Sequence, residues 1–390
     1  MTHVGFDKQI ELLKREYESE KQSYEKETQI TGIGRKVKRG DCWHPVRVGP
    51  ARYNSLDLYV VELSRSTDLD IEHNFEYGRP VIFFRRKDGQ QASDSAPKLK
   101  YFDFTATVSF VDGDRMVLTV PDNAPLLELS SSAEDVGCQL SFDETSYRAM
   151  FDALDRVSSA TTGRMAYLRE LLYNKPPKAT PQVFATACAR LPWLNDTQQQ
   201  AVDSVLRAKD VAIVHGPPGT GKTTTLVEAI NETLMREPQV MVCAQSNTAV
   251  DWISEKLTDR GIAVLRIGNP TRVDDKMLAF TYERRFEAHP DYSTLWAIRK
   301  AMRELRAQRR HSGESFHQKM NRLKSRATEL EIRIQAALFS QARVIASTLV
   351  GADSRLLAGL KVHTLFIDEA AQALEAATWI PMRRASRVVL

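Results

Sequence analysis

The stretch Val211–Ile230 reads VAIVHGPPGTGKTTTLVEAI and holds the clearest indication of the fold. Val211, Ile213 and Val214 form a short apolar, β-branched run that predicts a buried parallel strand, and a helix is predicted from Thr223 to Ile230. The loop between them has the spacing G-x-x-x-x-G-K-T. Strand, glycine-rich loop and helix in this order are typical of a phosphate-binding loop. The stretch therefore predicts an α/β domain that binds a nucleoside triphosphate.

Three glycines allow the backbone N–H groups of this loop to approach phosphate oxygens. Gly216, Gly219 and Gly221 permit geometries that a side chain would block, and the positive end of the following helix favours an anion. Lys222 is expected to reach the β- and γ-phosphates, and Thr223 to ligate magnesium. The expected cofactors are ATP and Mg²⁺. The predicted nucleotide-binding set also includes Pro217, Pro218, Thr220 and Thr224.

A second apolar run ends in two carboxylates. In HTLFIDEAAQALE (residues 363–375), the residues Leu365 to Ile367 predict a parallel strand that is followed by Asp368 and Glu369. Magnesium–nucleotide chemistry needs one acid that holds the metal and another that orients the attacking water. We assign Asp368 to the metal and Glu369 to the water. Exposed surface charge is the weaker explanation for adjacent acids after three apolar residues.

Length and composition set the limits. The chain has 390 residues, 42% hydrophobic content and a formal net charge of +4, which predicts two or three domains with real cores and permits a polyanionic partner. No apolar run reaches the roughly 18 residues that a bilayer span needs, so we expect a cytoplasmic protein with no membrane partner. The four cysteines form no C-x-x-C pair, so the sequence indicates neither a zinc module nor a disulfide framework.

The first half of the chain predicts an accessory unit. Residues 1–36 have the seam of one helix, and residues 142–175 predict a second helix and a linker, so the two helices are expected to pair as an antiparallel stalk. Residues 37–141 have the two-residue period of strands and predict a small β-barrel on that stalk. Strands are expected at residues 56–63, 80–84, 101–111 and 115–120, with a hairpin turn at VDGD, residues 111–114.

Two sets of polar residues each have two possible roles. Gln198 follows Asn195, which can cap a helix, and its amide also matches the donor and acceptor edge of adenine. Ser246, Asn247 and Thr248 follow a predicted strand that contains Val240 to Cys243. These small polar groups suit phosphate oxygens or sugar hydroxyls, but they are also ordinary turn and capping residues.

Six segments together resemble a known family. Their order and character are similar to the early motifs of superfamily I, subclass B helicases, in the group with the nonsense-mediated-decay RNA helicase and the immunoglobulin mu-binding helicase. The segments are LNDTQ (194–198), GPPGTGKT (216–223), CAQSNTAVD (243–251), RIGNPTR (266–272), VIASTLVGA (344–352) and IDEAAQALE (367–375). The resemblance implies a RecA-like parallel sheet over residues 176–390, a β-barrel on a helical stalk and a helical insertion at about 275–340.

The resemblance also implies roles for single residues. Gln198 would read adenine, and Gln372 would lie near the γ-phosphate. Ser246, Asn247 and Thr248, with Ser347 and Thr348, would contact the backbone of a single strand. The implied activity is stepping from 5′ to 3′ along single-stranded or partially duplex DNA or RNA. The expected partner is therefore nucleic acid.

The insertion adds a basic stripe. Arg303, Arg306 and Arg310 recur at three- and four-residue spacing, which puts them on one face of a helix. Such a face can neutralise several phosphates, each of which adds about −0.7 to the salt slope of single-strand binding. A salt-bridged coil is the alternative, but few acids balance this stripe.

The chain stops after ASRVVL, where helicases of this group continue into a second motor domain. The resemblance implies that the missing half supplies arginines that are worth roughly 10³ to 10⁵ in rate in related phosphoryl-transfer systems. We therefore expect residues 1–390 alone to be a truncated form that hydrolyses nucleotide very slowly.

Two classes of function stay open at this stage. One is an ATP-driven translocase, and the other is an ATP-gated module that clamps nucleic acid without unwinding it. A phosphate-loop kinase is disfavoured, because a kinase has no use for QSNTAVD (residues 245–251) or for a barrel on a stalk.

Overall fold

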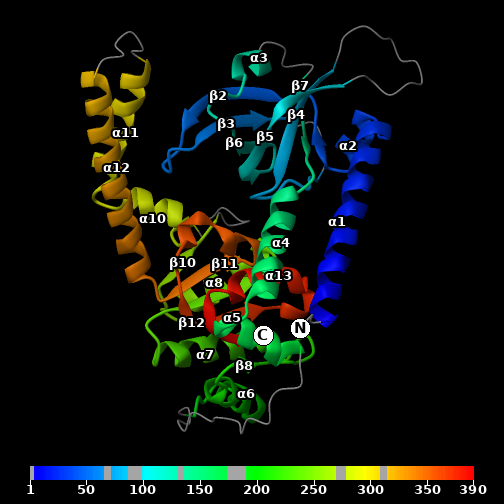
Figure 1. Cartoon of the computed structure of the whole chain (residues 1–390), viewed down its shortest axis with the longest axis vertical. Helices are drawn as coiled ribbons and strands as arrows, with labels where there is room; N and C mark the ends of the chain where they lie inside the picture. Colours follow the sequence, from blue (N-terminus) through cyan, green and yellow to red (C-terminus); the bar gives the residue numbers. More distant parts are fainter. Residues whose placement is uncertain are drawn as a thin grey trace. The chain divides into compact units, whose positions relative to one another are not determined.

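The computed structural model describes residues 4–65, 72–86, 99–130, 136–173, 190–268, 278–307 and 314–390 of the chain. These residues form two compact units (Figure 1). The first unit, which we call the motor unit, comprises residues 1–19, 144–270 and 339–390, and the second, the accessory unit, comprises residues 20–143 and 271–338. The predicted linker at residues 174–181 lies outside the described residues.

The motor unit contains a parallel sheet of six strands in the order β10-β11-β9-β12-β13-β8. This confirms the predicted α/β class. The strands are β8 (Val211–Ala212), β9 (Val240–Ala244), β10 (Val264–Arg266), β11 (Val344–Thr348), β12 (Val362–Asp368) and β13 (Ala385–Val389). Because β12 pairs with β9 and β13, its carboxyl end lies in the middle of the sheet's edge.

The first predicted strand is shorter than expected. The strand β8 ends at Ala212, and Ile213 is 73% exposed, so the prediction of a buried strand through Val214 was wrong. The reason is its position, because β8 lies at the edge of the sheet and pairs only with β13. Val214 still donates its backbone N–H to the carbonyl of Leu390 at 2.8 Å, which keeps the chain beside the sheet.

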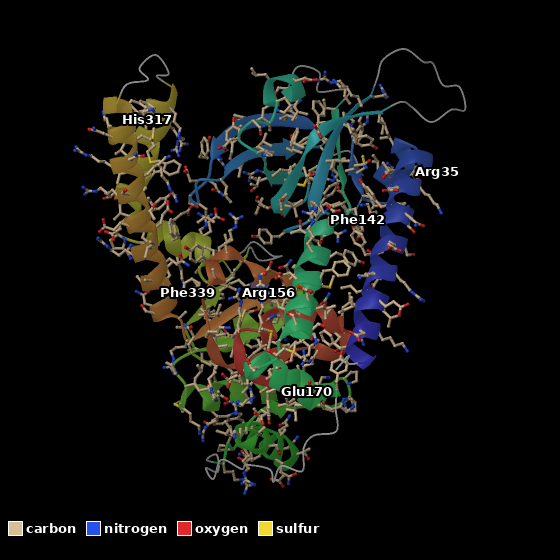
Figure 2. The ribbon with its side chains drawn as sticks, viewed as in Figure 1. Arg35, Phe142, Arg156, Glu170, His317 and Phe339 are labelled. Carbon is tan, nitrogen blue, oxygen red and sulfur yellow. The ribbon has the colours of Figure 1, made fainter. Side chains whose placement is uncertain are left out.

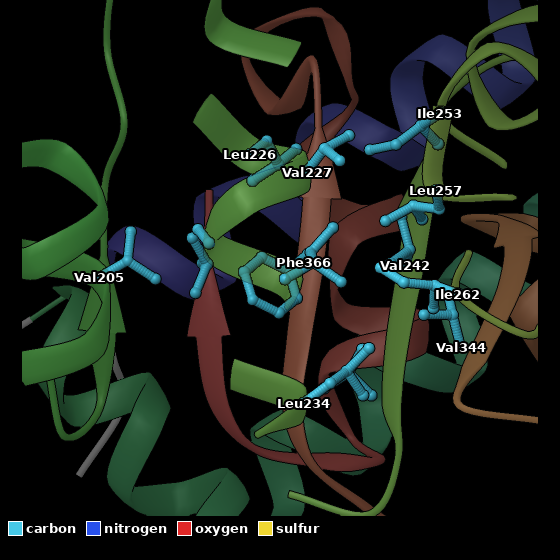
Figure 3. Packing of buried hydrophobic residues seen from close by; sticks show 14 of the residues in the cluster. Val205, Leu226, Val227, Leu234, Val242, Ile253, Leu257, Ile262, Val344 and Phe366 are labelled. Atoms are coloured by element: carbon cyan, nitrogen blue, oxygen red, sulfur yellow. The ribbon is translucent and has the colours of Figure 1, made fainter. Parts of the chain in front are cut away.

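Helices pack on the sheet and complete one apolar core. Figure 3 shows Phe366 of β12 among Val205, Leu234 and Val242, which come from two helices and the neighbouring strand. Phe366 and Val242 have no exposed surface. The helices and 3₁₀ turns of the motor unit after residue 190 are α6 (Asp196–Arg207), α7 (Lys222–Leu234), α8 (Asn247–Asp259), η1 (Val350–Asp353), η2 (Arg355–Leu357), η3 (Ala370–Gln372) and α13 (Glu375–Met382).

Three further helices are α1 (Val4–Ile30), α4 (Glu144–Ser159) and α5 (Gly163–Tyr173). Phe6 of α1 is buried, and its ring meets the rings of Tyr173 and Trp379 edge-on at centroid distances of 5.4 and 5.9 Å. The ring centroid of Tyr17 lies 5.3 Å from that of Tyr147 in α4, and these two rings also meet edge-on. The apolar side of α1 therefore contacts α4, α5 and α13. An amphipathic helix needs such partners, because its apolar side must be covered.

The accessory unit contains an antiparallel sheet of seven strands in the order β1-β7-β4-β5-β6-β3-β2 (Figure 1). Gly113 has a φ of +54° in the turn between β5 and β6, which confirms the hairpin predicted at VDGD. The strands and short helices are α2 (Ile33–Lys38), β1 (Cys42–Trp43), β2 (Arg47–Tyr53), β3 (Tyr59–Ser64), β4 (Pro80–Arg86), β5 (Leu99–Asp112), β6 (Arg115–Thr119), α3 (Leu126–Ser130) and β7 (Val136–Leu140).

The same unit contains the helical insertion, with α10 (Tyr282–Ala288), α11 (Tyr292–Ala307) and α12 (Glu314–Gln341). Its sheet buries an apolar cluster around Trp43, Phe83 and Leu118. Phe142 is labelled in Figure 2, and its ring lies 6.4 Å from that of Tyr24. Within the described parts of the chain, no helix is both long and apolar enough to cross a membrane.

We expect Phe366→Ala to lower the free energy of unfolding of the motor unit by about 3–5 kcal/mol, because the change leaves a cavity in the sheet core. Urea denaturation followed by circular dichroism measures the loss. Met235→Ala is the matched control, because Met235 is 73% exposed and its truncation should change stability by no more than about 0.5 kcal/mol. Similar losses in both variants would contradict the assignment of Phe366 to the core.

Candidate nucleotide site

The loop between β8 and α7 has the conformation of a phosphate cradle. Gly219 and Gly221 have φ values of +80° and +79°, in the left-handed region that glycine favours. Gly221 is the N-cap of α7, so the free N–H groups of that helix face the loop. The Thr220 hydroxyl donates to the Pro217 carbonyl at 2.8 Å and tightens the turn. The arrangement points a helix N-terminus at the space an anion would occupy.

Lys222 lies over the loop that precedes it. Its Nζ donates to the carbonyl oxygens of Gly216 at 3.0 Å and Pro217 at 3.4 Å. Both acceptors are uncharged, so a phosphate oxygen in the same place would be the stronger partner for the ammonium. The lysine is therefore held at the loop with its charge available to an anion.

The carboxyl end of β12 brings the acids to the same place. Burial raises the pKa of the Asp368 carboxyl, and the neighbouring Glu369 carboxylate raises it further. The backbone N–H of Glu369, 3.0 Å from Asp368 Oδ1, and the Lys222 ammonium lower that pKa. Asp368 ends β12, which pairs with β13, and β13 pairs with β8, so the acid and the loop that holds Lys222 lie at the same edge of the sheet. A bound cation would strengthen the charged form of Asp368 in the same way.

Glu369 has a strained backbone. Its φ is +52°, which is uncommon for a residue other than glycine and costs of order 1–3 kcal/mol. Its side chain is exposed, and Gln372 Nε2 donates to Glu369 Oε2 at 3.3 Å. The strained residue thus directs a carboxylate into the open, and the glutamine amide holds it there. Such strain is often found at functional sites.

These residues share one pocket of about 750 Å³, within the range of small-molecule sites. The predicted residues Pro218, Gly219, Gly221, Lys222, Thr223, Thr224, Glu369 and Gln372 line it. Five residues that the sequence reading did not select also line it: Val227, Trp252, Lys256, Asp259 and Arg260. The last four belong to or directly follow α8, whose spatial relation to the loop no sequence pattern indicates.

Gln198 lies against the loop and is already engaged in local hydrogen bonds. Its Oε1 accepts from the Asn195 backbone N–H at 3.0 Å, and Asn195 Oδ1 accepts from the Gln198 backbone N–H at 2.9 Å, which is a capping box. Its Nε2 donates to the Thr220 carbonyl at 3.1 Å. The capping role is therefore present in the structure, while the reading of adenine by Gln198 stays a prediction.

The oxygen groups at the site fit magnesium. The Thr223 hydroxyl and the Asp368 carboxylate are hard oxygen ligands, and magnesium is usually held by one or two carboxylates together with substrate phosphates. Among the residues that the structure describes, no group of three or more His, Cys, Asp or Glu side chains could hold a metal alone. Thr223 and Asp368 are therefore the residues that could hold magnesium together with phosphate oxygens.

The residues predicted to contact nucleic acid lie at the ends of two neighbouring strands. Ser347 of β11 pairs with Cys243 of β9, which brings Thr348 next to the segment that starts at Gln245. Ser246 caps α8 by accepting from the Ala249 N–H at 3.1 Å. Ser246 and Thr248 are exposed, and Asn247 and Thr348 are half-buried. Their contact with nucleic acid stays a prediction.

Ser347 differs from the others because it is fully buried. Its hydroxyl donates to the carbonyl of Thr348 at 3.0 Å and lies 3.5 Å from Cys243 Sγ. A side chain in this position is enclosed by the protein and does not reach a nucleic-acid strand at the protein surface. Ser347 is buried and Thr348 is partly exposed because neighbouring side chains of a strand point to opposite faces of the sheet.

One arginine of the basic stripe already has partners within the protein. Arg303 pairs with Asp57, and its guanidinium lies 4.8 Å from the ring centroids of Tyr53 and Trp296. The neighbouring Arg299 is 6% exposed and donates to the carbonyl of Ser55 at 2.7 Å. These arginines therefore hold the β2–β3 turn against α11, a contact within the accessory unit. Arg306 is exposed, and Arg310 lies outside the described residues.

Arg266 is a positioning residue that the motif RIGNPTR did not identify. It is 2% exposed, and its guanidinium binds Asp251 at 3.0 Å and Asn247 Oδ1 at 2.8 Å. The arginine thereby fixes the polar segment that begins α8. The sequence offers little to predict this role. It shows only an arginine in the short strand β10 and an acid, Asp251, four residues after Asn247.

Comparison with known proteins agrees with this site. A family model described as "AAA domain" matches residues 193–390. The DNA polymerase alpha-associated DNA helicase A of Schizosaccharomyces pombe is 32% identical over 202 residues, which are 50% of this chain and 31% of that protein. DNA-binding protein SMUBP-2 of Mesocricetus auratus is 30% identical over 266 residues, 64% of this chain and 26% of that protein. The Regulator of nonsense transcripts 1 homolog of Arabidopsis thaliana is 36% identical over 197 residues, which are 49% of this chain and 15% of that protein. The chain thus matches less than a third of the length of each of these three relatives.

Gly221→Ala should destabilise the motor unit more than Gly219→Ala. Both changes place a side chain at a positive φ, at a cost of about 1–2 kcal/mol. Only at Gly221 would the new Cβ lie 2.6 Å from another group, Gln198 Nε2, whereas Gly219 has open space. Thermal unfolding of the two variants measures the difference. Equal losses in the two single variants would show that Gln198 does not press on the loop.

Proposed function

This chain belongs to the superfamily I helicases of the nonsense-mediated-decay and mu-binding group, and on that basis we propose that it is the ATP-binding part of a motor. The motor hydrolyses ATP with magnesium and steps 5′ to 3′ along single-stranded DNA or RNA, separating duplexes ahead of it. The observation that carries the proposal is the single pocket in which Lys222, Thr223, Glu369 and Gln372 meet. Asp368 ends β12 directly before Glu369, and the Lys222 ammonium lowers the pKa of its carboxyl.

The residues of the pocket divide the work of hydrolysis. The Lys222 ammonium exchanges its two backbone carbonyl partners for oxygens of the β- and γ-phosphates. Thr223 and Asp368 would hold magnesium, which neutralises charge on the phosphates when it is bound. Glu369 accepts a hydrogen bond from the attacking water and orients it, and Gln372 keeps that carboxylate in place through its amide.

The strand ends beside the pocket supply the contact with nucleic acid. Ser246, Asn247, Thr248 and Thr348 offer hydroxyl and amide groups to phosphate oxygens, and none of them can read a base sequence by itself. Because β9 pairs with β12, these groups and the catalytic acids extend from adjacent strands of one sheet. The names of two relatives, a DNA helicase and a DNA-binding protein, support nucleic acid as the partner.

Two substitutions test the site. Lys222→Ala should abolish ATP binding measured by calorimetry, because it removes the cation that pairs with the phosphates. In the full-length protein, Glu369→Gln should keep ATP binding but lower ATP hydrolysis by about 10²-fold or more, because an amide cannot accept the water's proton. Lys361→Ala, at an exposed lysine on the opposite end of β12, is the control and should change neither quantity. Unaltered ATP affinity in Lys222→Ala would refute the site.

Strand displacement by the full-length protein tests the class. We expect ATP hydrolysis to rise with single-stranded nucleic acid and duplexes with a 5′ tail to be separated, whereas those with a 3′ tail stay paired. Affinity for nucleic acid that depends on nucleotide, without separation of either duplex, would instead establish an ATP-gated clamp. Separation only from a 3′ tail would refute the proposed direction.

A further inference from the structure

A buried arginine controls the orientation of one amide in the segment that we propose to contact nucleic acid. Arg266 of β10 is 2% exposed, and each of its three side-chain nitrogens has a partner. Nε donates to Asp251 Oδ1 at 3.0 Å, Nη1 donates to the carbonyl of Ile267, and Nη2 donates to Asn247 Oδ1 at 2.8 Å. Together these contacts hold the planar guanidinium in one position.

The arginine decides which end of the Asn247 amide is left for a ligand. A guanidinium has donors and no acceptor, so the amide must turn its oxygen toward Arg266. Turning the amide over would set Nδ2 against Nη2, a donor against a donor, inside the protein. The amide nitrogen therefore lies on the other side of the planar group. Asn247 is half-buried, and no group of the described residues accepts a hydrogen bond from its Nδ2.

Two neighbouring hydroxyls have the same polarity. Ser246 Oγ accepts from the Ala249 N–H at 3.1 Å, and Thr348 Oγ1 accepts from the Gly351 N–H at 3.0 Å. Each hydroxyl thus uses a lone pair inside the protein, and its hydrogen has no acceptor in the parts of the chain that the structure describes. Thr348 pairs in register with Ala244, two residues before Ser246. The adjacent ends of β9 and β11 therefore offer hydrogen-bond donors.

We propose that Arg266 is a positioning residue for nucleic-acid binding, which keeps the Asn247 amide nitrogen turned outward as a donor to a phosphate oxygen of the strand. A phosphate oxygen only accepts, and its charge makes the hydrogen bond stronger than one to a neutral sugar hydroxyl. DNA and RNA share this oxygen, so the segment binds the two alike. The inference rests on the proposed function and names the group of the strand that the segment contacts.

Asn247→Asp tests the polarity of the contact. A carboxylate still accepts from Arg266, but it presents a negatively charged acceptor where the amide presented donors. The probes are a labelled single-stranded DNA and an RNA of the same sequence, and fluorescence anisotropy measures their binding to the full-length protein. Both affinities should fall about tenfold or more. Gln200→Glu adds the same charge at an exposed position of α6 and should bind both probes as the original protein does.

Arg266→Lys tests the positioning in the same protein. Lysine keeps a charge beside Asp251 but cannot serve three acceptors in one plane, so the Asn247 amide becomes free to turn. The strand concentration that gives half-maximal ATP hydrolysis should rise about fivefold, with KM for ATP and the rate at saturating strand unchanged. Arg387→Lys is the matched control. Arg387 is another buried arginine of the sheet and donates to Thr364 Oγ1 at 2.9 Å, so its replacement should leave that strand concentration unchanged.

Three results would overturn the proposal. Unchanged affinity in Asn247→Asp would show that the amide donates nothing to the strand. RNA affinity that is kept while DNA affinity falls would indicate a sugar hydroxyl as the partner, because a hydroxyl can donate to the new carboxylate. An equal rise in strand concentration for Arg266→Lys and Arg387→Lys would leave Arg266 a structural role only.

Thermal unfolding confirms that each variant is folded, and Asn247→Asp carries the test if Arg266→Lys is not. Failure of the proposed function gives a different result, because then the original protein would bind neither probe.

Discussion

The arrangement of the nucleotide site depends on the parallel pairing of one sheet, which places Lys222 and Asp368 at the same edge. One residue begins α7 after an edge strand, and the other ends β12 near the middle of the sheet. Parallel strands point their carboxyl ends the same way, so the two segments meet at one edge although 145 residues separate them in the sequence. Asp368 is half-buried, and the Lys222 ammonium lowers the pKa of its carboxyl, whereas burial and the neighbouring Glu369 carboxylate raise that pKa.

The pocket combines rigid and strained elements. The sheet core below it is fully buried around Phe366 and Val242, which fixes the strand ends. Above it, Gly219, Gly221 and Glu369 take backbone conformations that most residues avoid. A well-packed core can hold such conformations, because the free energy from packing exceeds their cost. The packed core thereby holds the strand ends, and with them the loop and the acids, in fixed positions.

Arginine is used for position as much as for charge. Arg266 fixes Asp251 and Asn247 inside the motor unit, and Arg299 and Arg303 fix the turn around Ser55 inside the accessory unit. In each case a planar guanidinium serves several acceptors or rings at once, which lysine could not do. A basic residue in this chain is thus no sign by itself of a phosphate partner. The distinction needs the burial and the contacts of each side chain.

The sequence by itself determined the parallel-sheet class, the phosphate loop, the acids after β12 and the hairpin at VDGD, because each depends on residues that are near one another in the chain. The tertiary structure decided which distant groups meet. It shortened β8 at the sheet edge, buried Ser347, engaged Arg303 with Asp57 and brought Trp252 into the pocket. Periodicity fixes which side of a strand or helix a residue occupies, whereas the partner on that side is chosen by the packing of elements far apart in sequence.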